Sequence, residues 1–175
     1  MQGIDFQSQD PGLFNYPQIL HLLKVEFSRA RRYRYPLSCL LVQIDRLENL
    51  RDLYGIHMKE MVLDQVVSVI RVNSRSCDFL GKTGERLMMV LPHTDGEGVR
   101  AIARRIQEKL GQLRFEVDGR GITVTASMGG ATYEDHASIF FDTVIKNAET
   151  VLNQVIQSGG NGFRLFMPSA VPPTP

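Results

Sequence analysis

The chain has 175 residues, of which 43% are hydrophobic and 22% are charged, and its formal net charge is +1. These values are typical of one globular domain with a full core, and the near-neutral charge excludes the dense basic surface that duplex nucleic acids require. Cys39 and Cys77 show neither metal-site spacing nor a disulfide framework, so the expected location is a reducing cytoplasm.

The sequence also argues against membrane insertion. It has no apolar run of the roughly 20 residues that span a bilayer, and its first residues lack the layout of a signal peptide. We therefore expect a soluble domain, which leaves room for a larger, membrane-associated parent protein. Residues 1–11 are expected to be a leader or linker, 12–167 the folded domain, and 168–175 a proline-rich tail.

Helices and strands alternate along the predicted domain. The spacing of apolar residues predicts helices over 19–32, 58–72, 95–113 and 138–157, and residues 46–56 are expected to form a short helix and a turn at Tyr54-Gly55. The nearly continuous apolar run Leu37–Ile44 predicts a strand covered on both faces, and residues 162–166 predict a short final strand. This order predicts an α/β fold in which helices flank a central mixed β-sheet.

A first β-hairpin is expected between the third and fourth helices. The apolar stretches Phe79–Leu80 and Leu87–Leu91 flank the polar stretch GKTGER at 81–86. Glu85 and Arg86 are therefore expected near the tip, where loops often carry function, although a solvated turn would have the same composition.

A second hairpin is expected after the fourth helix. Residues 115–117 and 122–127 have the composition of strands, and they flank a turn at 118–121. The small residues Met128-Gly129-Gly130-Ala131 are predicted to be an exit from the second strand, because glycine weakens a strand interior.

Several segments occur in the order and spacing of one protein family. They are GLFN (12–15), RARR (29–32), PLSCLLVQID (36–45), YG (54–55), MMVLP (88–92), VTASMGGA (124–131) and SGGN (158–161). Together they resemble the GGDEF domain of diguanylate cyclases, which join two GTP molecules into cyclic di-GMP. The resemblance runs from Gly12 to Phe166, and it implies a nucleotidyl-cyclase-like palm with a signature β-hairpin.

The resemblance implies a catalytic site with two metal ions held by acidic side chains. At the family signature this chain has TGERL at 83–87, with one hairpin residue missing, and Glu85 matches one metal ligand. Gln43 stands in place of the metal-binding aspartate, and its neutral amide offers no charge to the metal. Asp45, which faces the same way, is a minor substitute.

The nucleotide contacts that the resemblance implies also differ. Glu48 replaces a phosphate-binding lysine, Arg51 replaces a guanine-binding asparagine, and Glu60 replaces its partner aspartate. Ile156 and Gly160 replace a late lysine and arginine. Because a carboxylate without a countercharge is unfavourable beside a triphosphate, we expect a degenerate domain that is not an enzyme, in which Mg²⁺ binding is lost and Glu85 is vestigial.

A second site of the family has the motif Arg-x-x-Asp before the signature strand, and it binds the product. Here the motif is RSCD at 75–78, and a further arginine of the site falls on Arg105. The resemblance therefore implies a cyclic di-GMP site made of Arg75, Asp78 and Arg105, whereas the motif alone is equally typical of a surface arginine paired with a turn aspartate. Guanidinium groups can hold phosphates or a guanine edge, and a carboxylate can accept hydrogen bonds from guanine N1–H and N2–H.

The first functional hypothesis is therefore a catalytically inactive GGDEF-like receptor for cyclic di-GMP. Its expected partners are cyclic di-GMP, other protein domains or subunits, and a second copy of the chain in a homodimer. Arg104 and Lys82 are further candidates for phosphate contacts. The alternatives are a ligand-independent interaction or dimerisation module and, third, a weak cyclase built on Glu85 and Asp45.

Overall fold

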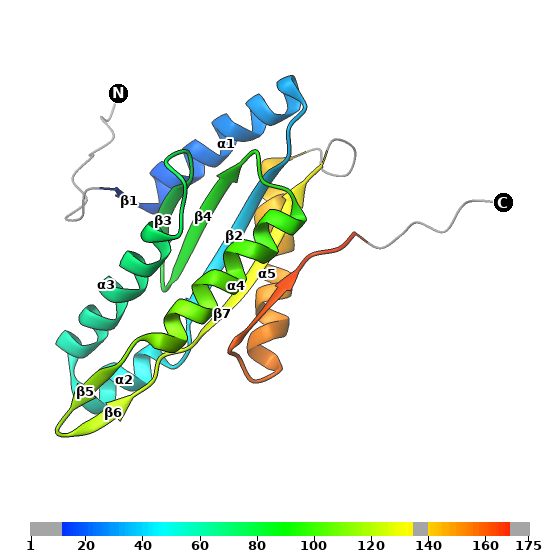
Figure 1. Ribbon diagram of the computed structural model, residues 1–175. Coiled ribbons are helices and arrows are strands. Elements are labelled where there is room, and N and C mark those ends of the chain that lie inside the picture. The colour runs from blue at the N-terminus through cyan, green and yellow to red at the C-terminus, as the bar shows by residue number, and fades with distance from the viewer. Residues whose placement is uncertain (1–11, 135–139, 169–175) are drawn as a thin grey trace.

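A six-stranded mixed sheet forms the centre of the computed structural model, which describes residues 12–134 and 140–168 (Figure 1). In spatial order its strands are β1 (Leu13–Phe14), β3 (Phe79–Thr83), β4 (Arg86–Pro92), β2 (Leu37–Ile44), β7 (Ala126–Tyr133) and β8 (Gly162–Leu165). The two outer pairs, β1 with β3 and β7 with β8, are parallel, and the inner pairs are antiparallel. The predicted α/β fold with a central mixed sheet is confirmed.

The helices that flank the sheet agree with the predicted segments, with ends that shift by a few residues. They are α1 (Tyr16–Tyr33), α2 (Leu47–Tyr54), α3 (Ile56–Val72), α4 (Gly96–Gln112) and α5 (Phe141–Gln157). Within the described ranges, none of them has the length and apolar character that crossing a bilayer requires. The leader predicted over 1–11, the tail beyond Pro168 and the helix start predicted at Ser138 lie outside the described residues.

The central strand β2 is buried on both faces, as its apolar run predicts. Leu40 and Val42 belong to one buried cluster, which includes residues of α3 and α4. Cys39 and Leu41 point to the other face and belong to a cluster with residues of α1 and α5. Figure 1 shows α4 on one side of the sheet and α1 and α5 on the other.

The first hairpin is tighter than predicted. Its strands extend to Thr83 and Arg86, which pair directly, so the turn contains only Gly84 and Glu85. Gly84 has a φ of +65°, a conformation that glycine adopts without strain. Arg86 also pairs with Gln43 of β2, which places the hairpin tip beside the end of the central strand.

The second hairpin differs from the prediction. Strands β5 (Phe115–Val117) and β6 (Arg120–Ile122) form a separate two-stranded sheet, whereas 126–133 is the long strand β7 of the main sheet. Gly129 and Gly130 therefore lie within a strand and do not end it. The reason is tertiary: a Cβ on Gly129 would lie 2.4 Å from the carbonyl oxygen of Ala148 in α5. Only glycine lets this helix approach the sheet so closely.

We expect Gly129→Ala to lower the free energy of unfolding by about 1–3 kcal/mol, because the added methyl group forces α5 away from β7. Chemical denaturation measures the change. Gly121→Ala is the matched control: it also adds a methyl group to a strand glycine, and nothing lies within 4 Å of that position. Equal stability of the two variants would contradict the proposed packing constraint.

Candidate functional site

Polar and charged residues lie at both ends of β4. Glu85 and Arg86 lie where the strand begins, and the segment from Pro92 to Asp95 follows where it ends. Six residue steps of about 3.3 Å separate the two ends by roughly 20 Å. The residues matched to the catalytic site and those matched to the product site therefore form two separate regions.

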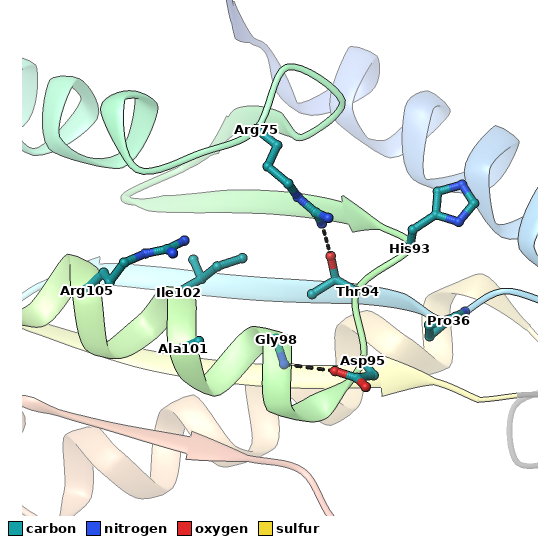
Figure 2. A pocket seen from close by; sticks show the side chains of 9 residues that line it. All are labelled: Pro36, Arg75, His93, Thr94, Asp95, Gly98, Ala101, Ile102 and Arg105. Carbon is teal, nitrogen blue, oxygen red and sulfur yellow. Dashed lines mark hydrogen bonds between the residues drawn. The ribbon is translucent and has the colours of Figure 1, made fainter.

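The second region contains a hollow of about 330 Å³, which we name the arginine pocket (Figure 2). It is lined by Pro36, Arg75, His93, Thr94, Asp95, Gly98, Ala101, Ile102 and Arg105. Arg75 comes from the loop between α3 and β3, and Arg105 comes from α4. The structure thus brings together two of the three residues that the sequence predicted for ligand binding.

Arg75 is half-exposed but firmly held at its tip. Its Nη2 donates a hydrogen bond to the carbonyl oxygen of Pro92 at 3.1 Å and a second one to the hydroxyl of Thr94. Thr94 is buried, and its own carbonyl oxygen accepts a hydrogen bond of 2.7 Å from Ser38. The hydroxyl of Ser38 lies 2.8 Å from that of Thr132 in β7. A chain of polar contacts therefore fixes Arg75 to the centre of the sheet.

Arg105 has a looser attachment. It is exposed, and its Nη2 donates a hydrogen bond of 3.3 Å to the carbonyl oxygen of Asn73, at the end of α3. Its guanidinium keeps most of its donors for a ligand. Arg104 and Lys82, the further candidates, are exposed and are not among the residues that line the arginine pocket.

Asp78 contacts Arg75 and does not line the arginine pocket. Its side chain is 1% exposed. One carboxylate oxygen accepts a hydrogen bond of 2.7 Å from the backbone N–H of Arg75, and the other lies 3.5 Å from the guanidinium of the same residue. In this structure Asp78 holds the loop that presents Arg75.

The sequence did not identify the other residues that line the arginine pocket, because the pattern around each of them indicates only its local secondary structure. Asp95 was predicted only as the first residue of the helix over 95–113, and its Oδ1 accepts a hydrogen bond of 2.9 Å from the N–H of Gly98. His93 stacks on Tyr35 with 3.8 Å between ring centres. Burial and the nearby Glu26 carboxylate raise the pKa of Tyr35 to about 12, so its hydroxyl remains a hydrogen-bond donor to Glu26.

At the other end of β4, Arg86 is hydrogen-bonded to Gln43, which stands in place of the metal-binding aspartate that the resemblance implies. The Nε of Arg86 donates a hydrogen bond of 3.0 Å to Gln43 Oε1. Arg86 also donates to Asn153 of α5 at 3.1 Å and lies 3.7 Å from a carboxylate oxygen of Glu149. The arginine of the altered signature therefore links the hairpin to β2 and α5.

The carboxylate of Asp45 is also hydrogen-bonded to groups of the protein itself. It accepts hydrogen bonds of 2.7 Å from Thr125, 2.6 Å from Ser127 and 2.9 Å from the backbone N–H of Asn161. Gly160 lies beside it, where a Cβ would come within 3.0 Å of Asp45 Oδ1. Asp45 thus closes the loop between α5 and β8 onto the end of β2. Ile156, the remaining substituted position, packs against the buried cluster of α1 and α5.

These side chains do not form a site for the two divalent cations that the resemblance implies. Glu85 is an exposed carboxylate, but the amide oxygen of Gln43 is bonded to Arg86, and Asp45 already has three hydrogen-bond donors. Within the described ranges, no three His, Cys, Asp or Glu side chains are grouped so that they could hold a metal ion. No catalytic step through a metal follows from this geometry.

Glu48 has the countercharges that the sequence argument assumed were missing. It forms an ion pair with Lys59 of α3 and another with Arg51, at 2.5 Å. The hydrogen bond from Lys59, together with the charge of Arg51, holds the pKa of Glu48 below the ordinary value for glutamate. The negative charge that replaces a family lysine is therefore offset locally. Glu60 is exposed and lies 3.6 Å from His57.

The fold and these two regions define a nucleotide cyclase-like domain, and comparison with known proteins identifies the family. Residues 10–162 match the family described as "Diguanylate cyclase, GGDEF domain", so the chain belongs to the GGDEF family. Diguanylate cyclase A of Treponema denticola is 29% identical over 151 residues, which cover 83% of this chain and 38% of that protein. The chain spans between about a fifth and two fifths of the length of the curated relatives that it matches.

Solved structures share the fold. The GGDEF domain of DgcB from Caulobacter crescentus, in complex with c-di-GMP, superposes with a TM-score of 0.83 at 18% identity, covering 94% of this chain and 98% of that one. The diguanylate cyclase SiaD from Pseudomonas aeruginosa, in complex with its activator SiaC, has a TM-score of 0.81 at 22% identity, with coverages of 89% and 60%.

The prediction that this domain is not an enzyme is contradicted by the comparisons. The matching family is one of diguanylate cyclases, and the relatives carry that name. The physical reason lies in the charge argument, which counted Glu48 as uncompensated although Lys59 and Arg51 pair with it. The loss of single family residues does not establish a loss of activity.

We expect the carboxyl group of Glu48 to titrate below the ordinary glutamate range, and Lys59→Met to raise its pKa, because the strongest hydrogen-bond donor to the charged form is removed. Carbon-detected NMR of the side-chain carboxyl against pH measures both values. Lys24→Met, on α1, is the control and leaves the titration unchanged. An unaltered pKa in the Lys59 variant would contradict the pairing.

The attachment of Arg75 predicts an energetic coupling with Thr94. A double-mutant cycle of Arg75→Ala and Thr94→Val should give a coupling free energy of about 0.5–1.5 kcal/mol in chemical denaturation, because each variant removes one partner of the same hydrogen bond. The cycle of Arg105→Ala with Thr94→Val is the reference and is expected to be additive. Additivity in both cycles would argue against the anchoring of Arg75 by Thr94.

Proposed function

We propose that this GGDEF domain is a cyclic di-GMP receptor that binds the dinucleotide in the arginine pocket. The observation that carries the proposal is the convergence of Arg75 and Arg105, 30 positions apart in the sequence, on one hollow. Cyclic di-GMP has two anionic phosphodiester groups, and guanidinium groups bind such oxygens with paired, charge-assisted hydrogen bonds.

The state of the two arginines supports the proposal. Arg75 is fixed by Pro92 and Thr94 before any ligand arrives, so little side-chain entropy is lost on binding. Arg105 contacts only a backbone carbonyl among the described residues and can adjust to the ligand. One rigid and one adaptable cation suit a ligand whose two phosphates must both be reached.

The remainder of the arginine pocket suits the nucleobases. Pro36, Ala101 and Ile102 present apolar groups, and His93, whose ring stacks on Tyr35, also lines the pocket. Such a lining, with a few convergent polar groups, is the usual chemistry of a nucleotide site. The solved GGDEF domain of DgcB, which shares this fold, was crystallised with c-di-GMP, and this supports the same ligand class here.

A receptor must transmit the binding of its ligand to another domain or protein. Other protein domains or subunits, or a second copy of this chain, are the proposed recipients, since the arginine pocket is open at the surface and a ligand there can be shared. The related fold in SiaD is found with an activator protein, which supports protein partners as a general property of the scaffold. If the following experiment detects no binding, a ligand-independent interaction module remains as the alternative.

Isothermal titration calorimetry with cyclic di-GMP tests the proposal. We expect a dissociation constant in the micromolar range or tighter, and a loss of about 10- to 100-fold in affinity for Arg75→Ala and for Arg105→Ala, as a charged hydrogen bond of about 1.5–3 kcal/mol is removed. Arg100→Ala is the matched control, because Arg100 is an exposed arginine of the same helix that does not line the arginine pocket. Absence of binding by folded wild-type protein would rule the receptor out.

A further inference from the structure

A guanine receptor needs a hydrogen-bond acceptor as well as cations, and the acceptor predicted from the sequence is unavailable. The Asp78 side chain is 1% exposed, and both of its oxygens face Arg75. If the Asp78 carboxylate turned toward a ligand, the backbone N–H and the guanidinium of Arg75 would lose their acceptor. Breaking such hydrogen bonds costs free energy, so Asp78 is not available to a base.

A different carboxylate lies in the arginine pocket. Asp95 is exposed, and it lines the hollow together with both arginines (Figure 2). Its Oδ1 caps α4 by accepting the N–H of Gly98, whereas its Oδ2 accepts no hydrogen bond from any described residue. Each carboxylate oxygen can accept two hydrogen bonds, so Asp95 retains acceptor capacity while it keeps its capping role.

The surroundings of Asp95 leave room for a base. A second hollow of about 240 Å³, which we name the tyrosine hollow, adjoins the first; it is lined by Arg34, Tyr35, Pro36, Asp95, Tyr133 and Glu134. Pro36 and Asp95 line both hollows, so the Asp95 carboxylate stands at their border. A base held by its edge at Asp95 would have aromatic and proline surfaces beside it.

We infer that Asp95 is the residue that reads the guanine edge in the arginine pocket, an inference that rests on the proposed function. Guanine presents N1–H and N2–H donors on adjacent atoms, and a carboxylate offers only acceptors. Adenine has an acceptor at N1 and no amino group at C2, so the same carboxylate faces an unpaired lone pair. Asp95 therefore supplies specificity for guanine over adenine, while Arg75 and Arg105 bind the phosphates.

The test compares cyclic di-GMP with cyclic di-AMP on wild type and on Asp95→Asn. Asparagine caps a helix as well as aspartate does, so α4 is retained, but its amide presents N–H donors to the guanine donors. We expect cyclic di-GMP to bind at least 10-fold more weakly, and the preference over cyclic di-AMP to fall by at least the same factor. The sign is informative, because removal of a negative charge from a pocket that contains two arginines would by itself strengthen the binding of an anion.

Two controls make the result specific. Glu97→Gln removes the same charge from an exposed residue in the first turn of α4 that does not line the arginine pocket, and it should leave the preference unchanged. Asp78→Asn should lower the melting temperature without changing the preference. If Asp95→Asn retains wild-type affinity and preference, this inference fails while the receptor stands. If wild type binds neither dinucleotide, the receptor and the role of Asp95 both fail.

Discussion

The ladder between β2 and β4 is the constraint on which both candidate regions depend. It pairs Leu37 with Pro92 at one end and Gln43 with Arg86 at the other, in an unbroken antiparallel register. A slip of one residue would exchange the two buried faces of β2 and place each side chain in the other core cluster, so the packing of both faces specifies the register. The ladder thereby fixes the hairpin tip beside the end of β2 and places the segment after Pro92 where Arg75 can reach it.

The two ends of this ladder use charge in different ways. At the tip, Arg86 bonds to Gln43 and α5, and the Glu48 carboxylate pairs with Lys59, so charges are neutralised within the protein. At the other end, Arg75 is hydrogen-bonded to a carbonyl and a hydroxyl group and lies 3.5 Å from Asp78, whereas Arg105 is bonded to a neutral carbonyl group. A surface that leaves guanidinium groups without full anionic compensation is suited to an anionic ligand. The family identity alone does not reveal this contrast, because it depends on which side chains face one another.

Much of the fold follows from the sequence, and the misses have physical causes. The strand Leu37–Ile44 has the predicted bounds because burial on both faces gives an uninterrupted apolar run. Gly129 was misread, because its small size serves contact with α5, a partner far along the chain. For the candidate site, the resemblance predicted that Arg75 and Arg105 act together, and both line one hollow. It could not reveal that a spacing of three residues lets the Asp78 carboxylate turn back onto the backbone N–H of Arg75.

The hydroxyl groups of Thr94, Ser38 and Thr132 connect Arg75 to two interior strands, and this has a mechanical consequence. A guanidinium drawn outward would leave a buried hydroxyl without its donor, so the anchored end resists displacement while the Arg105 side can yield. An occupant that contacts both arginines would therefore shift the Arg105 side chain before it shifts that of Arg75.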